Sequence, residues 1–270
     1  MRELKLIKSN MDFFSLLKYF IIGMNFVIIL VLKKVRDQAN LRERPEKAKK
    51  KCLVAIAHPD DESMFFLPLI DSLKDQGYTV HLLCFSNGNS SVREDELKKA
   101  AAFLNIDKFT VLDLTSKGIV DGMKNEWNTA TIGNTLLDYI KSETIEGLFT
   151  FDHHGVSGHL NHIALHKAVV NRPADFAGVK IYFLKSLPIF KKYFPLLEFC
   201  HILAKEFWTL LREITGYVQS TEEVFRFYNW NLVRVWTAMS LHYSQFVWYR
   251  KLFVLFSSYG FVNEFFLMRQ

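Results

Sequence analysis

The residues of this 270-residue chain that could carry chemistry begin with a short segment at 57–62, Ala-His-Pro-Asp-Asp-Glu. It brings His58, Asp60 and Asp61 together in the sequence. Two neighbouring carboxylates are costly to bury unless a cation balances their charge, and a divalent metal ion would do so. An Asp-Asp pair after Pro59 is also a common helix N-cap, so this segment alone leaves metal binding and helix capping open.

A second polar segment, residues 152–162, is rich in histidine. His159 and His162 are three residues apart and share one face if a helix begins just before them. With an aspartate of the first segment and a water molecule, two histidines would form the ligand set of a catalytic zinc site. His166 falls on the same face and offers a competing histidine pair, although its helix must pack on a sheet. His153 and His154, at the start of the segment, either line a pocket or face solvent.

The elements that must position these segments alternate between short apolar runs and helical patterns, which indicates a parallel α/β sheet. Predicted strands cover residues 52–57, 79–85, 109–113, 147–151 and 180–184, and predicted helices cover 63–76, 94–104, 129–142 and 159–170. We therefore expect a Rossmann-like parallel sheet with helices on both faces, connected by right-handed crossovers.

The predicted strand order places both polar segments at one edge of this sheet. If the sheet is doubly wound in the order 3-2-1-4-5, the first and fourth strands are neighbours, and ligands bind at their carboxyl ends. Residues 57–62 follow the first strand and residues 152–162 follow the fourth. This coincidence favours a single joint site over two unrelated polar loops.

The N-terminal part of the chain predicts a membrane anchor. Residues 13–32 are mostly apolar, and a helix of this length, at ~1.5 Å per residue, just crosses a ~30 Å hydrocarbon core. Lysines follow it in place of a small-residue cleavage site, which favours a transmembrane helix over a signal peptide. Lys and Arg are more numerous in residues 33–51 than in 1–12, so the positive-inside rule predicts a lumenal N-terminal segment, a basic linker at 33–51 and a cytosolic domain at 52–270.

The composition of the chain also indicates contact with a membrane. The net charge of +6 and the 15% aromatic content indicate a membrane surface or an anionic ligand. Nucleic acid is not expected, because no nucleic-acid-binding motif accompanies the basic residues. The aromatic-rich residues 246–266 predict either a core helix or a membrane-interfacial segment, in which Arg250 and Lys251 would contact lipid headgroups. Three scattered cysteines fit a reduced compartment better than a disulfide framework.

Several of these segments together resemble the PIG-L/LmbE-like family of metal-dependent N-acetylglucosaminyl deacetylases. The resemblance rests on residues 57–62, on Gly-Val-Ser-Gly-His-x-Asn-His at 155–162, on Cys-Phe-Ser-x-Gly-Asn at 84–89 and on the tail at 238–259. It is strongest to the members that act in glycosylphosphatidylinositol (GPI) anchor synthesis. It therefore implies hydrolysis of the N-acetyl group of the lipid N-acetylglucosaminylphosphatidylinositol, the second step of that synthesis. It also implies a single-pass protein of the endoplasmic reticulum membrane whose catalytic domain faces the cytosol.

The resemblance assigns roles that the spacing of residues leaves open. It makes His58, Asp61 and His162 the ligands of a divalent metal ion, with zinc the first expectation. It makes Asp60 the general base and His159 the group that stabilises the oxyanion. The choice of Asp61 over Asp60, and of His162 over His166, comes from the resemblance alone.

Substrate contacts are expected from Arg93, Asn89 and Asp121. Arg93 resembles an arginine that contacts substrate at its phosphate, but it could equally be an exposed first-turn residue. Asp121 precedes a glycine and could bind sugar hydroxyls or be an ordinary turn aspartate. The loop at 86–89, which contains Asn89, is expected to form a third wall of the site.

Two other functions remain compatible with these residues. One is a deacetylase of the same fold that acts on a soluble N-acetylglucosamine conjugate, which the predicted membrane anchor argues against. The other is a catalytically silent membrane scaffold. A complete ligand set beside a free carboxylate disfavours the scaffold, since binding alone does not need it.

Overall fold

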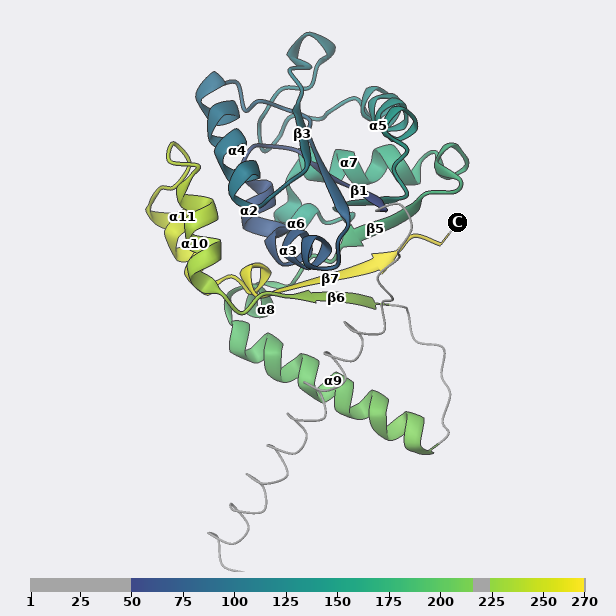
Figure 1. The fold of residues 1–270 in the computed structure, drawn as a ribbon, viewed down its shortest axis with the longest axis vertical. Helices are drawn as coiled ribbons and strands as arrows, with labels where there is room; N and C mark the ends of the chain where they lie inside the picture. Colours follow the sequence, from purple (N-terminus) through teal and green to yellow (C-terminus); the bar gives the residue numbers. More distant parts are fainter. Residues whose placement is uncertain (1–49, 216–223, 270) are drawn as a thin grey trace, which may run out of the picture. The chain divides into compact units, whose positions relative to one another are not determined.

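The computed structural model describes residues 50–215 and 224–269 (Figure 1). The predicted transmembrane helix at 13–32 and the segment at 1–12 lie outside the described residues, as does the linker before Lys50. None of the helices that the structure describes is long and apolar enough to cross a membrane. The chain divides into two compact units, and every candidate site residue belongs to the one that comprises Arg44–Glu198 and Ser220–Gln270.

In the described residues, seven strands form one sheet in the order β3-β2-β1-β4-β5-β7-β6 (Figure 1). The strands are β1 Lys51–Ile56, β2 Thr79–Cys84, β3 Lys108–Val111, β4 Gly147–Phe151, β5 Lys180–Leu184, β6 Val224–Tyr228 and β7 Val262–Leu267. Strands β1 to β5 pair in parallel in the predicted order. The predicted parallel sheet therefore covers β1 to β5, and the whole sheet is mixed, because β7 pairs antiparallel with both β5 and β6.

Helices connect these strands. They are α2 Asp61–Phe65, α3 Leu67–Asp75, α4 Ser91–Phe103, α5 Thr129–Glu143, α6 Gly155–Gly158, α7 Leu160–Val170, α8 Ile189–Tyr193, α9 Pro195–Thr215, α10 Leu232–Ser240 and α11 Trp248–Phe256. Short 3₁₀ turns lie at Thr115–Lys117, Pro173–Phe176 and Ser258–Gly260. Helices α5 and α7 pack together and α7 contacts β1 and β4, whereas α3 contacts β2, β6 and β7.

The predicted helix at 63–76 is two helices, α2 and α3, that meet at Phe66. Pro68 lies in the first turn of α3, where a missing backbone N–H costs nothing, and it favours a new helix start there. This break leaves α2 as a short helix whose first residues, Asp61 and Glu62, are buried beneath the C-terminal segment.

The centre of the core lies at β1 and β4. All five residues of β4 are buried, as are all residues of β1 after Lys51. Their parallel register pairs Val54 with Phe149, so both strands end at the same edge of the sheet. Continuous apolar strands of this kind are typical of a sheet covered on both faces.

The aromatic-rich C-terminal segment divides between core and surface. Tyr259 and Phe265 are fully buried, and Phe265 lies in β7. In contrast, Trp248 is 73% exposed and Phe256 is 54% exposed on α11. Neither a core helix nor an interfacial segment therefore describes residues 246–266 as a whole.

Candidate active site

The turn after β1 places three buried acidic side chains at the edge of the sheet. Asp60, Asp61 and Glu62 are at most 3% exposed. Asp60 has a backbone φ of 125°, a conformation that L-residues rarely adopt. Its backbone N–H donates to Glu62 Oε2 at 3.1 Å, which helps to hold the strained turn in place. Strain of this kind is common where a side chain is positioned for function.

Asp61 is fixed by backbone hydrogen bonds on one of its two oxygens. Oδ2 accepts from the N–H groups of Ala57 at 3.1 Å and His58 at 2.9 Å. Oδ1 lies 3.3 Å from His162 Nε2. Burial by itself would raise the pKa of Asp61, but His162, His58 and the backbone hydrogen bond outweigh it and hold this pKa well below its usual range. The carboxylate is therefore ionised, and it presents Oδ1 to His162 and Oδ2 to His58.

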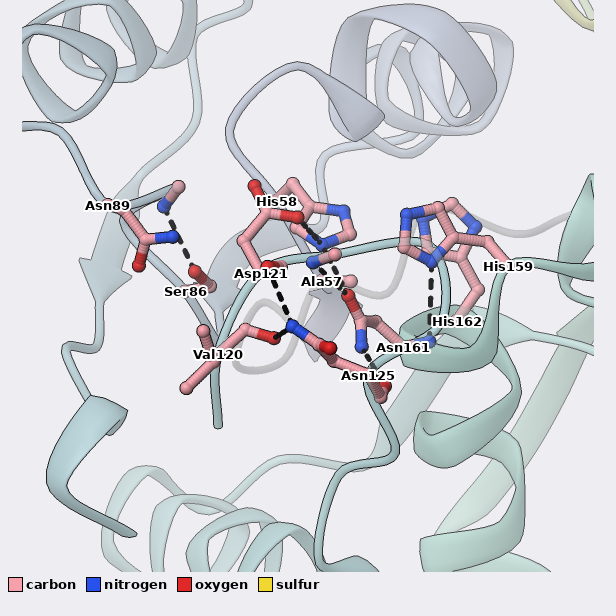
Figure 2. Close-up of polar contacts among 12 residues, drawn as sticks. Ala57, His58, Ser86, Asn89, Val120, Asp121, Asn125, His159, Asn161 and His162 are labelled. Carbon is pink, nitrogen blue, oxygen red and sulfur yellow. Dashed lines mark hydrogen bonds and ion pairs between the residues drawn. The ribbon is translucent and has the colours of Figure 1, made fainter. Parts of the chain in front are cut away.

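His58 is held through one of its ring nitrogens. Nε2 lies 3.0 Å from Asp121 Oδ1 and 3.0 Å from Asn161 Oδ1 (Figure 2). Nδ1 lies on the side of Asp61, 3.8 Å from its Oδ2. Burial opposes protonation, but the hydrogen bond to Asp121 and the neighbouring carboxylates raise the pKa of His58 above its ordinary value. A proton on Nε2, donated to Asp121, would leave the Nδ1 lone pair free.

His162 is held in the same manner by a different acceptor. Its Nδ1 lies 3.2 Å from the carbonyl oxygen of Gly155, and its ring stacks on Phe151 with the centroids 3.9 Å apart. Nε2 is buried and faces Asp61 Oδ1 at 3.3 Å. Gly155 has a positive φ of 53°, and a Cβ there would lie 2.9 Å from the Cβ of His162. Glycine at this position thus lets the loop after β4 pack against the histidine.

His159 completes a group of three histidines. It is the N-cap residue of α7, where its Nδ1 accepts from the backbone N–H of Asn161 at 3.3 Å. Its ring stacks on that of His162, with the centroids 4.6 Å apart (Figure 2). Burial lowers the pKa of His159 to about 4, and the nearby His162 and His58 make smaller contributions in the same direction. His159 is therefore neutral at neutral pH.

These side chains together could hold a metal ion. Within the described part of the chain, donor atoms of His58, His159 and His162 all lie within 4.8 Å of one another. The group shares His58 and His162 with the predicted ligand set, and it contains His159 where that set contains Asp61. The buried Nε2 of His162, which faces the ionised Asp61 carboxylate, fits the needs of a divalent cation. The geometry leaves Asp61 and His159 as alternative third donors.

Asp60 faces two arginines. Its Oδ2 lies 3.8 Å from Arg93 Nη2 and forms a close ion pair with Nη1 of Arg250. Arg250 lies on α11, and burial lowers its pKa. One of the two interpretations of residues 246–266 expected this arginine at lipid headgroups, and its contact with Asp60 was missed because nothing in that segment connects it to residues 57–62. The contact makes the C-terminal segment part of the site.

Arg93 and Asp121 are connected to His58 in a chain of contacts. Arg93 is only 8% exposed, so it is not the exposed first-turn residue that one interpretation expected. It donates from Nη1 to Asp121 Oδ2 at 2.9 Å and from Nη2 to the carbonyl oxygen of Pro59 at 3.0 Å. Gly88 makes room for it, since a Cβ there would lie 2.3 Å from Arg93 Nη1. A substrate contact by Arg93 or Asp121 remains a prediction.

The loop after β2 is the third predicted wall. Asn89 is exposed, has a φ of 57°, and donates from its backbone N–H to Asn87 Oδ1 at 2.9 Å. Figure 2 shows Asn89 beside Ser86, on the Asp121 side of His58. Its contact with substrate also remains a prediction.

Other polar residues support the site without having been singled out from the sequence. Asn161 accepts from the Gly122 N–H at 3.2 Å with the same oxygen that faces His58. Glu62 and His242 are both fully buried, and His242 Nε2 lies 2.6 Å from Glu62 Oε1. The pair is separated by 180 residues, so only the resemblance of the tail at 238–259 could have pointed to it.

His166, the competing candidate, lies elsewhere. Its ring packs on Phe183 with the centroids 4.6 Å apart, and burial lowers its pKa to about 4. It is not a member of the histidine group. This position agrees with a packing histidine on a helix that covers the sheet.

Comparisons with known proteins give one consistent family. A family model described as PIG-L, GlcNAc-PI de-N-acetylase, matches residues 53–172. The "Probable N-acetylglucosaminyl-phosphatidylinositol de-N-acetylase" of Schizosaccharomyces pombe is 39% identical over 175 residues, which cover 63% of this chain and 70% of the relative. The "N-acetylglucosaminyl-phosphatidylinositol de-N-acetylase" of Bos taurus is 32% identical over 234 residues, covering 82% and 87%. The fold is similar to that of N,N'-diacetylchitobiose deacetylase from Pyrococcus horikoshii, with a TM-score of 0.53, 16% identity and coverage of 88% and 91%.

Proposed function

The chain belongs to the PIG-L family of N-acetylglucosaminyl-phosphatidylinositol de-N-acetylases, and from that membership we propose the reaction it catalyses. It hydrolyses the N-acetyl group of N-acetylglucosaminylphosphatidylinositol and gives acetate and glucosaminylphosphatidylinositol, the second step of GPI-anchor biosynthesis. The observation that carries this function is the buried group at the ends of β1 and β4. There, two histidines each turn a ring nitrogen toward the ionised Asp61, and a second carboxylate lies beside them.

His58, Asp61 and His162 would hold a divalent metal ion, and we take zinc as the first candidate. Each histidine has one nitrogen at a protein acceptor and the other toward Asp61, as is usual for metal-binding imidazoles. Asp61 is preferred to His159 as third ligand because its negative charge offsets that of a buried cation. A bound divalent ion would supply Lewis-acid activation of the acetamide carbonyl and of water.

The remaining residues carry the proton transfers and the charge. Asp60 accepts a proton as water attacks the acetamide carbon, while Arg93 and Arg250 hold its carboxylate at the side of the site. His159, neutral because its pKa is lowered to about 4, donates a hydrogen bond to the oxygen on which negative charge develops. Asp60 then returns the proton to the nitrogen of glucosamine, and the C–N bond breaks to release acetate. Arg93 and Asp121 keep the His58 ring in its orientation throughout.

The cellular setting is part of the proposal. The apolar residues 13–32 and the basic residues after them support a single-pass protein of the endoplasmic reticulum membrane with its catalytic domain in the cytosol. A lipid substrate requires the site to work close to a bilayer. A deacetylase of a soluble N-acetylglucosamine conjugate is less favoured, because the relatives at 39% and 32% identity are named for the phosphatidylinositol-linked substrate.

The test is acetate release from detergent-solubilised N-acetylglucosaminylphosphatidylinositol by the full chain. We expect turnover that a chelator abolishes and added zinc restores. Release of acetate from a soluble N-acetylglucosamine conjugate but not from the lipid would support the alternative substrate. No release from either, with the metal bound, would reject the proposed function.

A further inference from the structure

Two neighbouring helices expose an unusual number of large apolar side chains. Ile189 and Phe190 on α8, Phe194 directly after it, and Trp248, Leu252 and Phe256 on α11 are each between 47% and 73% exposed. The two helices are in contact, and the rings of Tyr193 and Phe253 lie 6.1 Å apart between them. We call these six exposed side chains the α8–α11 surface. Large exposed apolar areas are uncommon on soluble monomers, and a group of exposed apolar side chains on two contacting helices is typical of a binding face.

The charged residues of the two segments that carry this surface are mostly basic. Residues 189–198 and 247–257 contain one carboxylate, Glu198, which is 1% exposed and lies 3.6 Å from Lys191 Nζ. Lys251 is exposed on α11, and its Nζ lies 5.4 Å above the Phe246 ring. The patch therefore combines exposed aromatic rings with lysines and exposes no acidic group. This composition suits the interface of a bilayer, where aromatic rings lie at headgroup level and lysines meet anionic lipids.

Both helices are tied to the active site. Arg250 follows Trp248 by two positions, about 200° around a helix of ~3.6 residues per turn, and it pairs with Asp60. On α8, Lys192 is 8% exposed and donates from Nζ to the carbonyl oxygen of Val156 in α6, the short helix directly before His159. On α11, the side that carries Arg250 thus contacts the site while the other side presents apolar residues to solvent, and α8 is joined to the site through Lys192.

We propose that the α8–α11 surface docks on the lipid bilayer that contains the substrate. The inference rests on the proposed function, since a lipid-linked sugar must reach Asp60 while its acyl chains stay in the membrane. The docked surface lies at headgroup level, so that the acetylated sugar extends from the bilayer into the site beside α11. A second copy of the chain is the competing occupant. The bilayer is favoured because two copies of a patch with lysines and no exposed carboxylate would repel one another.

The experiment compares two presentations of the same headgroup. The full chain carrying Phe190→Glu and Leu252→Glu is assayed on long-chain substrate in vesicles of phosphatidylcholine and phosphatidylserine, and on a short-chain, water-soluble analogue. We expect a loss of at least tenfold on vesicles and a change of less than twofold on the analogue. The control variant carries Ala130→Glu and Ser142→Glu, both exposed on α5, and should match the unmodified chain on both substrates.

Three results would overturn the docking surface. The first is equal activity of the variant and the unmodified chain on vesicles. The second is an equal loss on both substrates, with or without a changed sedimentation coefficient, since that result indicates damage to the fold or to a contact between copies. The third is tryptophan emission that brominated lipids quench equally in the unmodified chain and in Trp248→Phe. If the unmodified chain releases no acetate from either substrate, the proposed function itself fails, and the lipid quenching measurement still tests the surface.

Discussion

His58 and His162 show how single contacts set the state of a side chain. In each imidazole, one nitrogen contacts a protein acceptor. The acceptor is Asp121 for His58 and the Gly155 carbonyl oxygen for His162. The other nitrogen then has to face the ionised Asp61. The sequence shows that these residue types occur together, but the tautomer of each ring follows from its acceptor, which lies 63 residues away for His58 and in the turn before α7 for His162.

The two adjacent aspartates are expected to separate metal binding from catalysis. Asp60→Asn should keep its metal and lose turnover by about 10²- to 10⁴-fold, because a general base is removed while the ligands stay. Asp61→Ala should lose both metal and turnover. Elemental analysis of the purified variants, with parallel rate measurements, checks this. A full metal content in Asp61→Ala would contradict its assignment as a ligand.

Asp121 is expected to act through His58 as a positioning residue. Asp121→Ala should weaken metal affinity by about 10- to 100-fold, and Asp121→Asn, which keeps an acceptor but loses the charge, by less. Competition with a calibrated chelator measures both. The control is Asp113→Asn, an exposed aspartate that accepts two hydrogen bonds from Thr115 in its own turn, and the metal affinity of this variant should not change. If Asp121→Ala binds metal as tightly as the unmodified chain, the contact with His58 has no positioning role.

The last two strands show how an element outside the predicted pattern is held. Glu264 of β7 accepts from Lys185 at 2.8 Å and from Arg226 of β6 at 2.6 Å, so it joins the end of β5 to β6. Burial would raise the pKa of Glu264, but Lys185 and Arg226 outweigh it and lower this pKa to about 2. The folded state therefore binds fewer protons than the unfolded state between that value and the ordinary one.

Glu264→Gln is expected to lower the free energy of unfolding at pH 7 by about 3 kcal/mol. The folded pKa is depressed, so the contribution of Glu264 is complete above pH 4.5, the ordinary pKa, and is lost as the pH falls toward about 2. Urea unfolding of both proteins at pH 7 and at pH 3 measures the difference, which should shrink at the lower pH. A difference that stays constant with pH would show that charge pairing at β7 is not its source.

At the scale of the whole molecule, residues of the C-terminal segment contact the site residues that follow β1. His242 pairs with Glu62, Arg250 with Asp60, and Asn263 accepts from the Leu69 N–H at the start of α3. The family model matches only residues 53–172, yet these contacts come from residues beyond it. The site is therefore a property of the complete fold.

His242→Ala is expected to destabilise the whole fold by about 3–5 kcal/mol, because it leaves the Glu62 carboxylate buried without its partner. The neighbouring Tyr243 is 85% exposed, and Tyr243→Ala should change stability by no more than about 0.5 kcal/mol. Chemical denaturation of the two variants makes the comparison. Equal stabilities would mean that the buried pair contributes nothing to the stability of the fold.

The sequence by itself determined β1 to β5, their order and the edge at which His58 and His162 would meet. It could do so because apolar periodicity and right-handed crossovers are local or nearly local constraints. Family resemblance added the choice of Asp61 as a ligand. Only the tertiary structure decided that β7 runs antiparallel beside β5, that Arg93 is buried against Asp121, and that Arg250 reaches Asp60. These contacts depend on how distant segments pack against one another. Neither segment alone carries a periodic pattern from which that packing could be predicted.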